Sequence, residues 1–293
     1  MTTGSGAPRG STRLAAVIGS PVRHSLSPVV HNAAFRAAGL DWTFLAFEVQ
    51  PSALVAALDG VRALGIAGLS VTMPHKEDVA HLVDELSDDA RLLDAVNCVV
   101  NDGGRLVGHN TDGPGFVAAL EADLGVTPAG RRCLVVGAGG AARAVVLALG
   151  RAGASTVVVA NRTVERAEQA AELAGAAGRP VALADVADEV RLADIVVNAT
   201  SVGMGLQGSA DVAFPPDALR PGQVVADIVY QPLVTPLVAA ARRRGLAATN
   251  GVSMLVHQAA VAFELWTGTP APVAVMAAEV EQSLATLGEP SPR

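Results

Sequence analysis

The chain has 293 residues, of which 51% are apolar and only 3% aromatic, and it carries a formal net charge of −7 at pH 7. This length predicts about two domains with aliphatic cores, and the acidic balance argues against nucleic acid as the main partner. No run of about 18 residues is apolar enough, and free enough of charge and proline, to predict a membrane span.

The two ends of the chain carry no pattern of a folded element. Residues 1–13 are small and polar without an apolar segment, so we expect a disordered tail and not a signal peptide. We expect residues 288–293 to be disordered as well. Cys98 and Cys133 lie in separate apolar runs, which predicts buried thiols in a reducing cytoplasm and not a disulfide framework.

In the first half, short apolar strands alternate with helical patterns, which is typical of an open α/β sheet covered by helices. Strands are predicted at 14–18, 42–49, 68–71 and 97–100, and helices at 28–38, 51–64, 90–93 and 112–124. The glycine-bounded loop at 125–130 marks a plausible domain boundary.

The second half has the rhythm of one dinucleotide-binding domain. Its predicted strands are 132–136, 156–160, 180–183, 194–199 and 223–227, with a helix from the first strand's glycine-rich turn to about residue 152. Arg242, Arg243 and Arg244 precede Gly245, and we interpret them as the last turn of a helix. Helices at 253–266 and 272–287 could return to pack on the first domain.

The glycine-rich turn has the form G-x-G-x-x-A and spans Gly137 to Ala142. A strand runs into it and a helix leaves it, which is the context that a pyrophosphate site needs. Gly137 permits the tight turn, Gly139 lets the backbone approach the phosphates, and the helix N-terminus attracts their charge. The alternative is an ordinary glycine-rich turn.

The end of the next strand indicates which cofactor is bound. An acidic residue there would bind the 2′-hydroxyl of NAD, but this chain has Asn161-Arg162-Thr163, with Arg166 one helical turn further on. Two guanidinium groups can hold a 2′-phosphate, which favours NADP. The alternative is that these arginines pair with Glu165 or Glu168 on the surface.

Lys76 is the single lysine of the chain, beside 20 arginines. A sequence with this bias retains lysine where a compact ammonium that can release a proton is needed. We therefore interpret Lys76 as a proton-transfer residue. The alternative is a surface lysine that escaped the bias.

Ser25 and Ser27 follow the first strand and precede Pro28. Residues two apart in an extended segment point the same way, so their hydroxyls could bind one anion. Capping of the following helix would explain Ser27, but it would not explain Ser25. Asp112 could likewise be an ordinary acid at a helix start.

Further polar residues follow predicted strands, where ligands bind in open α/β sheets. Thr72 and Tyr230, the only tyrosine, are of this kind, and Asn97 starts or precedes a strand in which asparagine fits poorly. The six histidines show no metal-ligand spacing, and we interpret them as polar or packing residues.

Eight segments in this order resemble the shikimate dehydrogenase family, from about Leu14 to Leu284. They are His24-Ser-Leu-Ser-Pro28, Val71-Thr-Met-Pro-His-Lys76, Asp94-Ala-Val-Asn97, Asn110-Thr-Asp112, Gly137-Ala-Gly-Gly-Ala141, Asn161-Arg-Thr163, Asn198-Ala-Thr-Ser-Val-Gly203 and Gly251-Val-Ser-Met-Leu-Val-His-Gln258.

The resemblance implies an α/β fold of two domains and the reversible, NADPH-dependent reduction of 3-dehydroshikimate to shikimate in aromatic (chorismate) biosynthesis. A substrate-binding and catalytic domain would span 14–111 and a Rossmann-like NADP domain 112–250. The helices of 251–287 would pack back on the substrate domain. The protein would be a monomer or homodimer that binds only small molecules.

The resemblance also implies the roles of individual residues. Lys76 would be the acid/base with Asp112 as its partner, and no metal would be required. The residues expected to hold the substrate are Ser25, Ser27, Thr72, Asn97, Asp112, Tyr230 and Gln258. The residues expected to hold NADP are Gly137, Ala138, Gly139, Gly140, Ala141, Asn161, Arg162, Thr163, Arg166, Ile228, Gly251 and, at the periphery, Asp88.

Two alternatives remain. One is a quinate/shikimate or aminoshikimate-type dehydrogenase, although such relatives often carry an acid where this chain has Asn161-Arg162. The other is a catalytically inactive nucleotide-binding paralogue, which would have no need of Lys76, Asp112 and both serines.

Overall fold

The computed structural model describes residues 7–205 and 211–287, and the chain divides into two compact units. The first unit contains Met1–Thr111 and Gln258–Arg293, and the second contains Asp112–His257. Residues 1–6 of the predicted N-terminal tail (1–13) and the predicted tail at 288–293 lie outside the described residues. Inside the predicted N-terminal tail, the hydroxyls of Ser11 and Thr12 donate to Asp41, and the first strand begins at Arg13. Order therefore starts before Leu14.

The first unit is built on a mixed six-stranded sheet with the order β2-β1-β3-β5-β6-β4. Its strands are β1 (Arg13–Gly19), β2 (Trp42–Glu48), β3 (Gly68–Val71), β4 (Glu85–Leu86), β5 (Cys98–Asp102) and β6 (Arg105–His109). Its helices are α1 (Ser27–Ala37), α2 (Leu54–Leu64), α3 (Lys76–Leu82), α4 (Asp88–Leu93), α11 (Val273–Leu287) and the part of α10 (Gly251–Thr267) from Gln258 onward.

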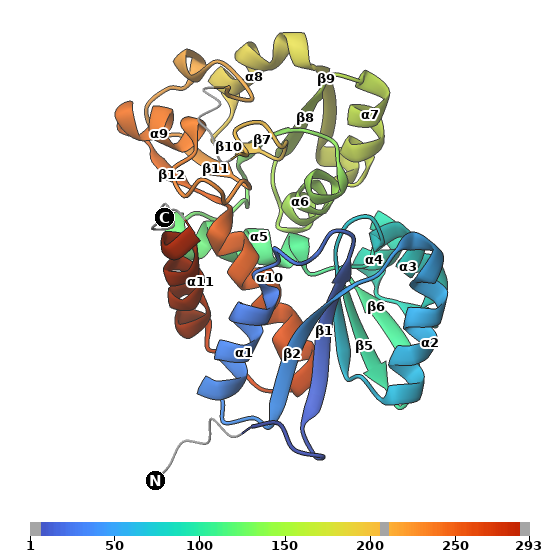
Figure 1. Ribbon diagram of the computed structural model, residues 1–293. Coiled ribbons are helices and arrows are strands. Elements are labelled where there is room, and N and C mark those ends of the chain that lie inside the picture. The colour runs from blue at the N-terminus through green and yellow to red at the C-terminus, as the bar shows by residue number, and fades with distance from the viewer. Residues whose placement is uncertain (1–6, 206–210, 288–293) are drawn as a thin grey trace. The chain divides into compact units, whose positions relative to one another are not determined.

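Helices cover both faces of this sheet (Figure 1). On one face, α2, α3 and α4 bury an aliphatic core with β1 and β3 that includes Leu58, Leu69 and Val79. On the other face, α1, β2 and the end of α10 form an aromatic cluster of His31, Phe35, Phe44, Phe263 and Trp266. In that cluster Trp266 donates its indole N–H to the Val99 carbonyl at 3.0 Å. Helix α11 packs against α1.

The hairpin of β5 and β6 was not predicted, and it makes this sheet mixed rather than parallel. β5 pairs antiparallel with both β3 and β6. The turn between β5 and β6 contains Gly103 and Gly104, whose φ angles of 60° and 98° favour glycine. Because β5 runs against β3, the start of β5 lies at the edge where β1 and β3 end.

The second unit is an all-parallel six-stranded sheet with the order β12-β11-β10-β7-β8-β9. Its strands are β7 (Arg132–Val136), β8 (Thr156–Asn161), β9 (Gly178–Ala182), β10 (Ile195–Asn198), β11 (Val224–Asp227) and β12 (Ala247–Thr249). Its helices are α5 (Asp112–Leu124), α6 (Gly140–Arg151), α7 (Val164–Glu172), α8 (Val186–Leu192), α9 (Pro236–Arg243) and the first part of α10. Among the described residues, short 3₁₀ helices lie at Gly175–Ala177, Leu183–Asp185 and Pro216–Ala218 in this unit and at Pro51–Ala53 in the first.

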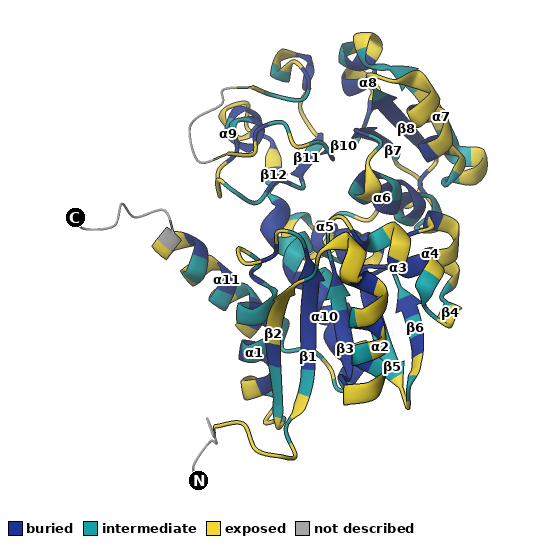
Figure 2. Cartoon of the chain, turned by 45° about the vertical axis from the view of Figure 1, so that its right-hand side comes forward, coloured by how far each residue is buried: buried dark blue, intermediate teal, exposed yellow. Residues whose placement is uncertain are grey.

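This strand order is the doubly wound arrangement: β7 to β9 extend the sheet to one side, and β10 to β12 extend it to the other, so the order reverses between β7 and β10. The central strands β7, β8, β10 and β11 are buried on both faces, as Figure 2 shows in dark blue for β7 and β8, because α5, α6 and α7 cover one face and α8 and α9 the other. The edge strand β9 has no buried residue. The predicted Rossmann-like fold is thus confirmed. The predicted end of α9 is correct to within one residue: its last turn holds Arg242 and Arg243, Arg244 occupies the C-cap position, and Gly245 follows with φ 75°.

Candidate functional site

Ser25 and Ser27 lie together in the loop between β1 and α1. Both are half-buried, and their hydroxyl oxygens are 3.2 Å apart. The alternative that Ser27 caps α1 is not borne out, because Ser27 is the first helical residue and Leu26 occupies the cap position. It is Ser25 whose hydroxyl accepts the Ser27 N–H, at 3.2 Å. Two adjacent hydroxyls at the start of a helix suit an anion such as a carboxylate.

Thr72 and Lys76 follow β3 at the same edge of the sheet. The Thr72 N–H donates to Ile18 of the parallel neighbour β1, which fixes where the loop leaves the strand. His75 is fully buried, and its Nε2 lies 2.7 Å from the Val49 carbonyl. Lys76 then opens α3, with a half-buried side chain and a backbone carbonyl that accepts the Val96 N–H at 2.8 Å. The bond of the neighbouring His75 to Val49 and the bond of Lys76 to Val96 therefore fix the backbone at Lys76.

Asn97 is buried, at 5% exposure, immediately before β5. Its side chain is oriented by Thr111: Asn97 Nδ2 donates to Thr111 Oγ1 at 3.0 Å, and the Thr111 N–H donates to Asn97 Oδ1 at 2.7 Å. Thr111 also reaches Gln258 Oε1 at 3.5 Å. The structure thus brings together Asn97 and Gln258, which are far apart in the sequence.

Thr111 was not among the predicted site residues, although it lies inside the Asn110-Thr-Asp112 motif. Its side chain is 1% exposed, so its contacts are internal. The motif was the one sequence signal that pointed to Thr111. Its bond to Asn97 could not be read from the motif, because it depends on the hairpin that places His109 opposite Cys98. Asp112 follows as the buried first residue of α5.

In the second unit, the glycine-rich turn opens α6. Gly137 has φ 117°, and a Cβ there would lie 2.8 Å from the Ala199 carbonyl oxygen, so only glycine fits. Gly139 occupies the N-cap position without a capping side chain, and the first turn of α6 contains no acid. A Cβ at Gly139 or Gly140 would meet nothing within 4 Å. Exposed backbone, free N–H groups and an uncompensated helix dipole fit a pyrophosphate.

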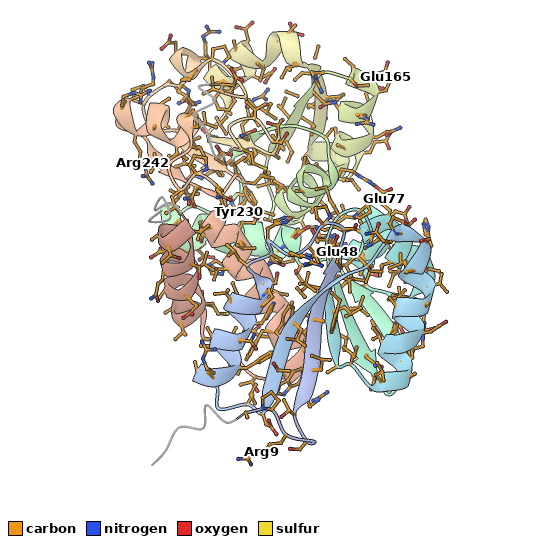
Figure 3. The ribbon with its side chains drawn as sticks, viewed as in Figure 1. Arg9, Glu48, Glu77, Glu165, Tyr230 and Arg242 are labelled. Carbon is orange, nitrogen blue, oxygen red and sulfur yellow. The ribbon has the colours of Figure 1, made fainter. Side chains whose placement is uncertain are left out.

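The segment from Asn161 to Arg166 lies beside this turn, after the parallel neighbour β8. Asn161 Nδ2 donates to the Thr163 carbonyl at 2.9 Å, which shapes the loop into α7. Arg162 and Arg166 are exposed, and neither forms an ion pair within the described part of the chain. Pairing with Glu165, on the outer side of α7 (Figure 3), or with Glu168 is therefore not observed. Two unpaired guanidinium groups fit a 2′-phosphate.

Ile228 and Tyr230 follow β11, and the backbone of Ile228 and Val229 touches Gly251 at the start of α10. Gly251 donates its N–H to the Val229 carbonyl at 3.0 Å, and a Cβ on Gly251 would lie 2.0 Å from the Ile228 oxygen. Only glycine permits this approach. Tyr230 (Figure 3) is half-buried, and burial raises the pKa of its phenol.

Asp88 belongs to the first unit, where it starts α4 and its carboxylate accepts from Arg91 Nη1 at 3.2 Å. These contacts explain the position of Asp88 within its own helix, and its contact with a cofactor stays a prediction.

None of the helices among residues 7–205 and 211–287 is long and apolar enough to cross a membrane. Within the same residues, no group of three or more His, Cys, Asp or Glu side chains is placed to hold a metal ion.

Comparisons with known proteins agree with this arrangement. Three family models match the chain: the shikimate dehydrogenase substrate-binding domain over residues 17–99, shikimate / quinate 5-dehydrogenase over 121–235, and the shikimate 5′-dehydrogenase C-terminal domain over 251–281. Shikimate dehydrogenase (NADP(+)) of Moorella thermoacetica is 49% identical over 274 residues, which covers 92% of each chain.

Solved structures give the same picture. Shikimate 5-dehydrogenase of Thermus thermophilus, crystallised with NADP(H) and shikimate, superposes with a TM-score of 0.85 at 39% identity and covers 93% of this chain and all of that one. A shikimate dehydrogenase crystallised with NADP+ gives a TM-score of 0.88 at 37% identity over 95% of this chain and 98% of that one. The chain described here therefore belongs to the shikimate dehydrogenase family.

Proposed function

We propose that this protein catalyses the reversible reduction of 3-dehydroshikimate to shikimate with NADPH. The observation that carries the proposal is the position of the single lysine. Lys76 opens α3 at the sheet edge where Ser25, Thr72 and Asn97 also lie. A proton donor beside several hydroxyl and amide groups suits the reduction of a ketone on a polyhydroxylated ring.

On the substrate side, Ser25 and Ser27 would bind the carboxylate, with Tyr230 as a further donor. Thr72, Asn97, Asp112 and Gln258 would bind the ring hydroxyls. The contacts of Thr111 with both Asn97 and Gln258 support this assignment, because they fix two amide side chains relative to one another before a ligand arrives. Such preorganisation lowers the entropy lost on binding.

On the cofactor side, Gly137, Ala138, Gly139, Gly140 and Ala141 would cradle the pyrophosphate at the N-terminus of α6. The 2′-phosphate would be held by Asn161, Arg162, Thr163 and Arg166. Ile228 and Gly251 would line the nicotinamide, and Asp88 would be a peripheral contact. When bound, NADPH supplies the hydride for the ketone carbon.

The protein's own chemistry is then a proton transfer. Negative charge develops on the substrate oxygen as the ketone is reduced, and the Lys76 ammonium donates a proton to that oxygen. Asp112 is assigned as the carboxylate that accompanies Lys76 in this step. General acid catalysis of this kind typically contributes about 10²–10⁴-fold to the rate.

The remaining assignments follow from this function. Residues 14–111 would form the substrate-binding domain, 112–250 the NADP domain, and 251–287 the helices that complete the first domain. The partners would be the small-molecule substrate and cofactor, with the protein acting as a monomer or homodimer. Cys98 and Cys133 are both buried free thiols, which supports a reducing compartment such as the cytoplasm.

The test is an oxidation assay with shikimate and quinate, each with NADP+ and NAD+. Rapid turnover of shikimate with NADP+ alone is the expected outcome. Comparable turnover of quinate, or equal use of NAD+, would favour the quinate/shikimate type. No turnover with either acid, together with measurable NADP+ binding, would favour an inactive paralogue.

A further inference from the structure

Two buried polar side chains end neighbouring strands of the second sheet. Asn198 is the last residue of β10 and Asp227 the last residue of β11, and they are directly paired in the strand register. Their exposures are 1% and 2%. The reaction proposed above assigns no role to either residue. Burying a carboxylate is costly unless it is hydrogen-bonded, so this placement calls for a reason.

The Asp227 carboxylate is the acceptor of three hydrogen bonds. Oδ1 accepts from Asn198 Nδ2 at 2.9 Å and from the Val229 N–H at 3.1 Å, and Oδ2 accepts from the Thr235 hydroxyl at 2.7 Å. Burial raises the pKa of Asp227, and these three bonds oppose that rise. The three donors come from three different segments of the chain.

Each donor fixes a loop of its own. Asn198 Oδ1 accepts from the Thr200 N–H at 3.0 Å and from the Thr200 hydroxyl at 2.7 Å, which holds the loop after β10. Thr235 caps α9 by accepting the Val238 N–H at 3.2 Å. The carboxylate therefore joins the loop after β10, the loop after β11 and the start of α9.

The third donor, Val229, is held on both sides. Its N–H is bound by Asp227, and its carbonyl accepts the Gly251 N–H at 3.0 Å. The preceding Ile228 N–H donates to the Asn198 carbonyl at 3.0 Å. The backbone between Ile228 and Tyr230 thus has little freedom, and these are the residues assigned to the nicotinamide and to the substrate carboxylate.

We propose that Asp227 is a positioning residue, which holds the Ile228–Tyr230 segment in the geometry needed for the nicotinamide half of the cofactor. The inference rests on the proposed function. It assigns no contact between Asp227 and cofactor or substrate. Because the adenine half would be bound by the separate segments after β7 and β8, the effect of Asp227 should be confined to the nicotinamide half.

The experiment compares two ligands on the full-length protein. Adenosine 2′,5′-bisphosphate carries only the adenine half with its 2′-phosphate, whereas NADP+ carries both halves. In Asp227→Ala, calorimetry should give a dissociation constant for NADP+ roughly 10- to 100-fold higher, because binding must then also order the Ile228–Tyr230 segment that Asp227 holds in the wild type. The constant for adenosine 2′,5′-bisphosphate should change by less than about two-fold, which is within the usual scatter for independent sites. Asp227→Asn, which keeps an acceptor oxygen, should recover part of the NADP+ affinity.

Gln223→Ala is the matched control. Gln223 is equally buried, at 2%, near the opposite end of β11, where its Nε2 donates to the carbonyls of Val190 and Ala193. It should lower stability without separating the two ligands. If Asp227→Ala does not fold, Thr235→Val takes its place, because it removes the hydroxyl that donates to Asp227 Oδ2 at 2.7 Å, and the same separation is expected.

Equal weakening of both ligands, or of neither, would overturn the inference. A failure of the proposed function would look different: the wild-type protein would then neither bind NADP+ nor oxidise shikimate.

Discussion

Asn97 and Thr111 are both buried and bond to one another: Asn97 Nδ2 donates to the Thr111 hydroxyl oxygen at 3.0 Å, and the Thr111 N–H donates to Asn97 Oδ1 at 2.7 Å. The pair links the end of β3 to the end of β6, because the Asn97 carbonyl also accepts the Val71 N–H at 2.8 Å. A substrate that binds Asn97 therefore meets an amide whose orientation is already fixed.

Thr111→Val tests this pair. Valine has nearly the same shape but removes the hydroxyl, so we expect a loss of about 1 kcal/mol in unfolding free energy. We also expect the Michaelis constant for shikimate to rise roughly 3- to 10-fold, because a weakening of substrate binding by about 1 kcal/mol corresponds to a change of that size. Thr43→Val makes the same substitution on β2, away from the Asn97–Thr111 pair, and as the control it should leave the Michaelis constant unchanged. An unchanged Michaelis constant in Thr111→Val would show that the pair serves the fold alone.

Lys76→Ala should lower turnover by about 10²–10⁴-fold with little change in shikimate affinity, because the ammonium acts on the developing charge. Lys76→Arg should recover little activity, since a guanidinium hardly releases its proton. Steady-state kinetics with NADP+ and shikimate measure both variants. Near-normal turnover in Lys76→Arg would rule out proton transfer by this side chain.

Arg162→Ala should raise the Michaelis constant for NADP+ by roughly 10- to 100-fold and leave that for NAD+ nearly unchanged, because only NADP+ carries the 2′-phosphate. Arg179→Ala is a suitable control, as Arg179 is an exposed arginine of the same unit that binds backbone carbonyls. A wild-type protein that uses NAD+ as readily as NADP+ would contradict the interpretation of Asn161–Arg166.

Ser25→Ala should weaken shikimate binding by roughly 10-fold or more, as expected for a lost bond to a carboxylate. It should also cost about 1 kcal/mol of stability, because Ser25 accepts the Ser27 N–H. The two effects are separated with an analogue whose carboxylate is replaced by a neutral group. Wild type and Ser25→Ala should bind this analogue almost equally, and an unchanged affinity for shikimate would place the carboxylate elsewhere.

His31 makes stability depend on pH. It is 1% exposed, its ring lies 4.5 Å from that of Phe44 and 4.9 Å from that of Trp266, and burial lowers its pKa to about 3. Below about pH 6.5 the unfolded chain takes up a proton at this residue and the folded chain does not. As the pH falls from about 6.5, the ordinary pKa of histidine, towards about 3, the pKa of His31 in the folded protein, the unfolding free energy should therefore decrease by up to about 1.4 kcal/mol per pH unit.

Urea titrations at pH 7.5 and pH 5.5 measure this effect. Wild type should lose about 1 kcal/mol more than His31→Phe over that interval. His24→Gln, at an exposed histidine, should behave as wild type does. Identical pH dependence of wild type and His31→Phe would mean that His31 is protonated in the folded protein.

The sequence predicted the second unit better than the first for a physical reason. The turn at Gly137 and the strand that runs into it are local patterns, which a short stretch of sequence contains in full. The hairpin of β5 and β6 depends on Gly103 and Gly104, a turn signal that was present but was not used. The start of α1 was misplaced because Pro28 was taken as its first residue, whereas Ser27 is already helical.

The buried contacts could not be predicted from single positions. Thr111 acquires its role from Asn97, and Asp227 from Asn198, and each pair meets only because two strands adopt a particular register. Sequence patterns identify which residues are polar near strand ends. They do not state which of these polar residues bond to one another.

Helix α10 begins in the second unit and continues in the first, since the division falls between His257 and Gln258. The second unit is thus a continuous insertion, whereas the first is assembled from two separated pieces of chain. During synthesis, the sheet of the first unit cannot complete its aromatic face until Trp266 has been made, because Trp266 bonds Val99 and packs against Gly68. The insertion can be completed sooner, so the part proposed to hold the cofactor would be the first to mature on the ribosome. It is also the part that could be exchanged between relatives as one cassette.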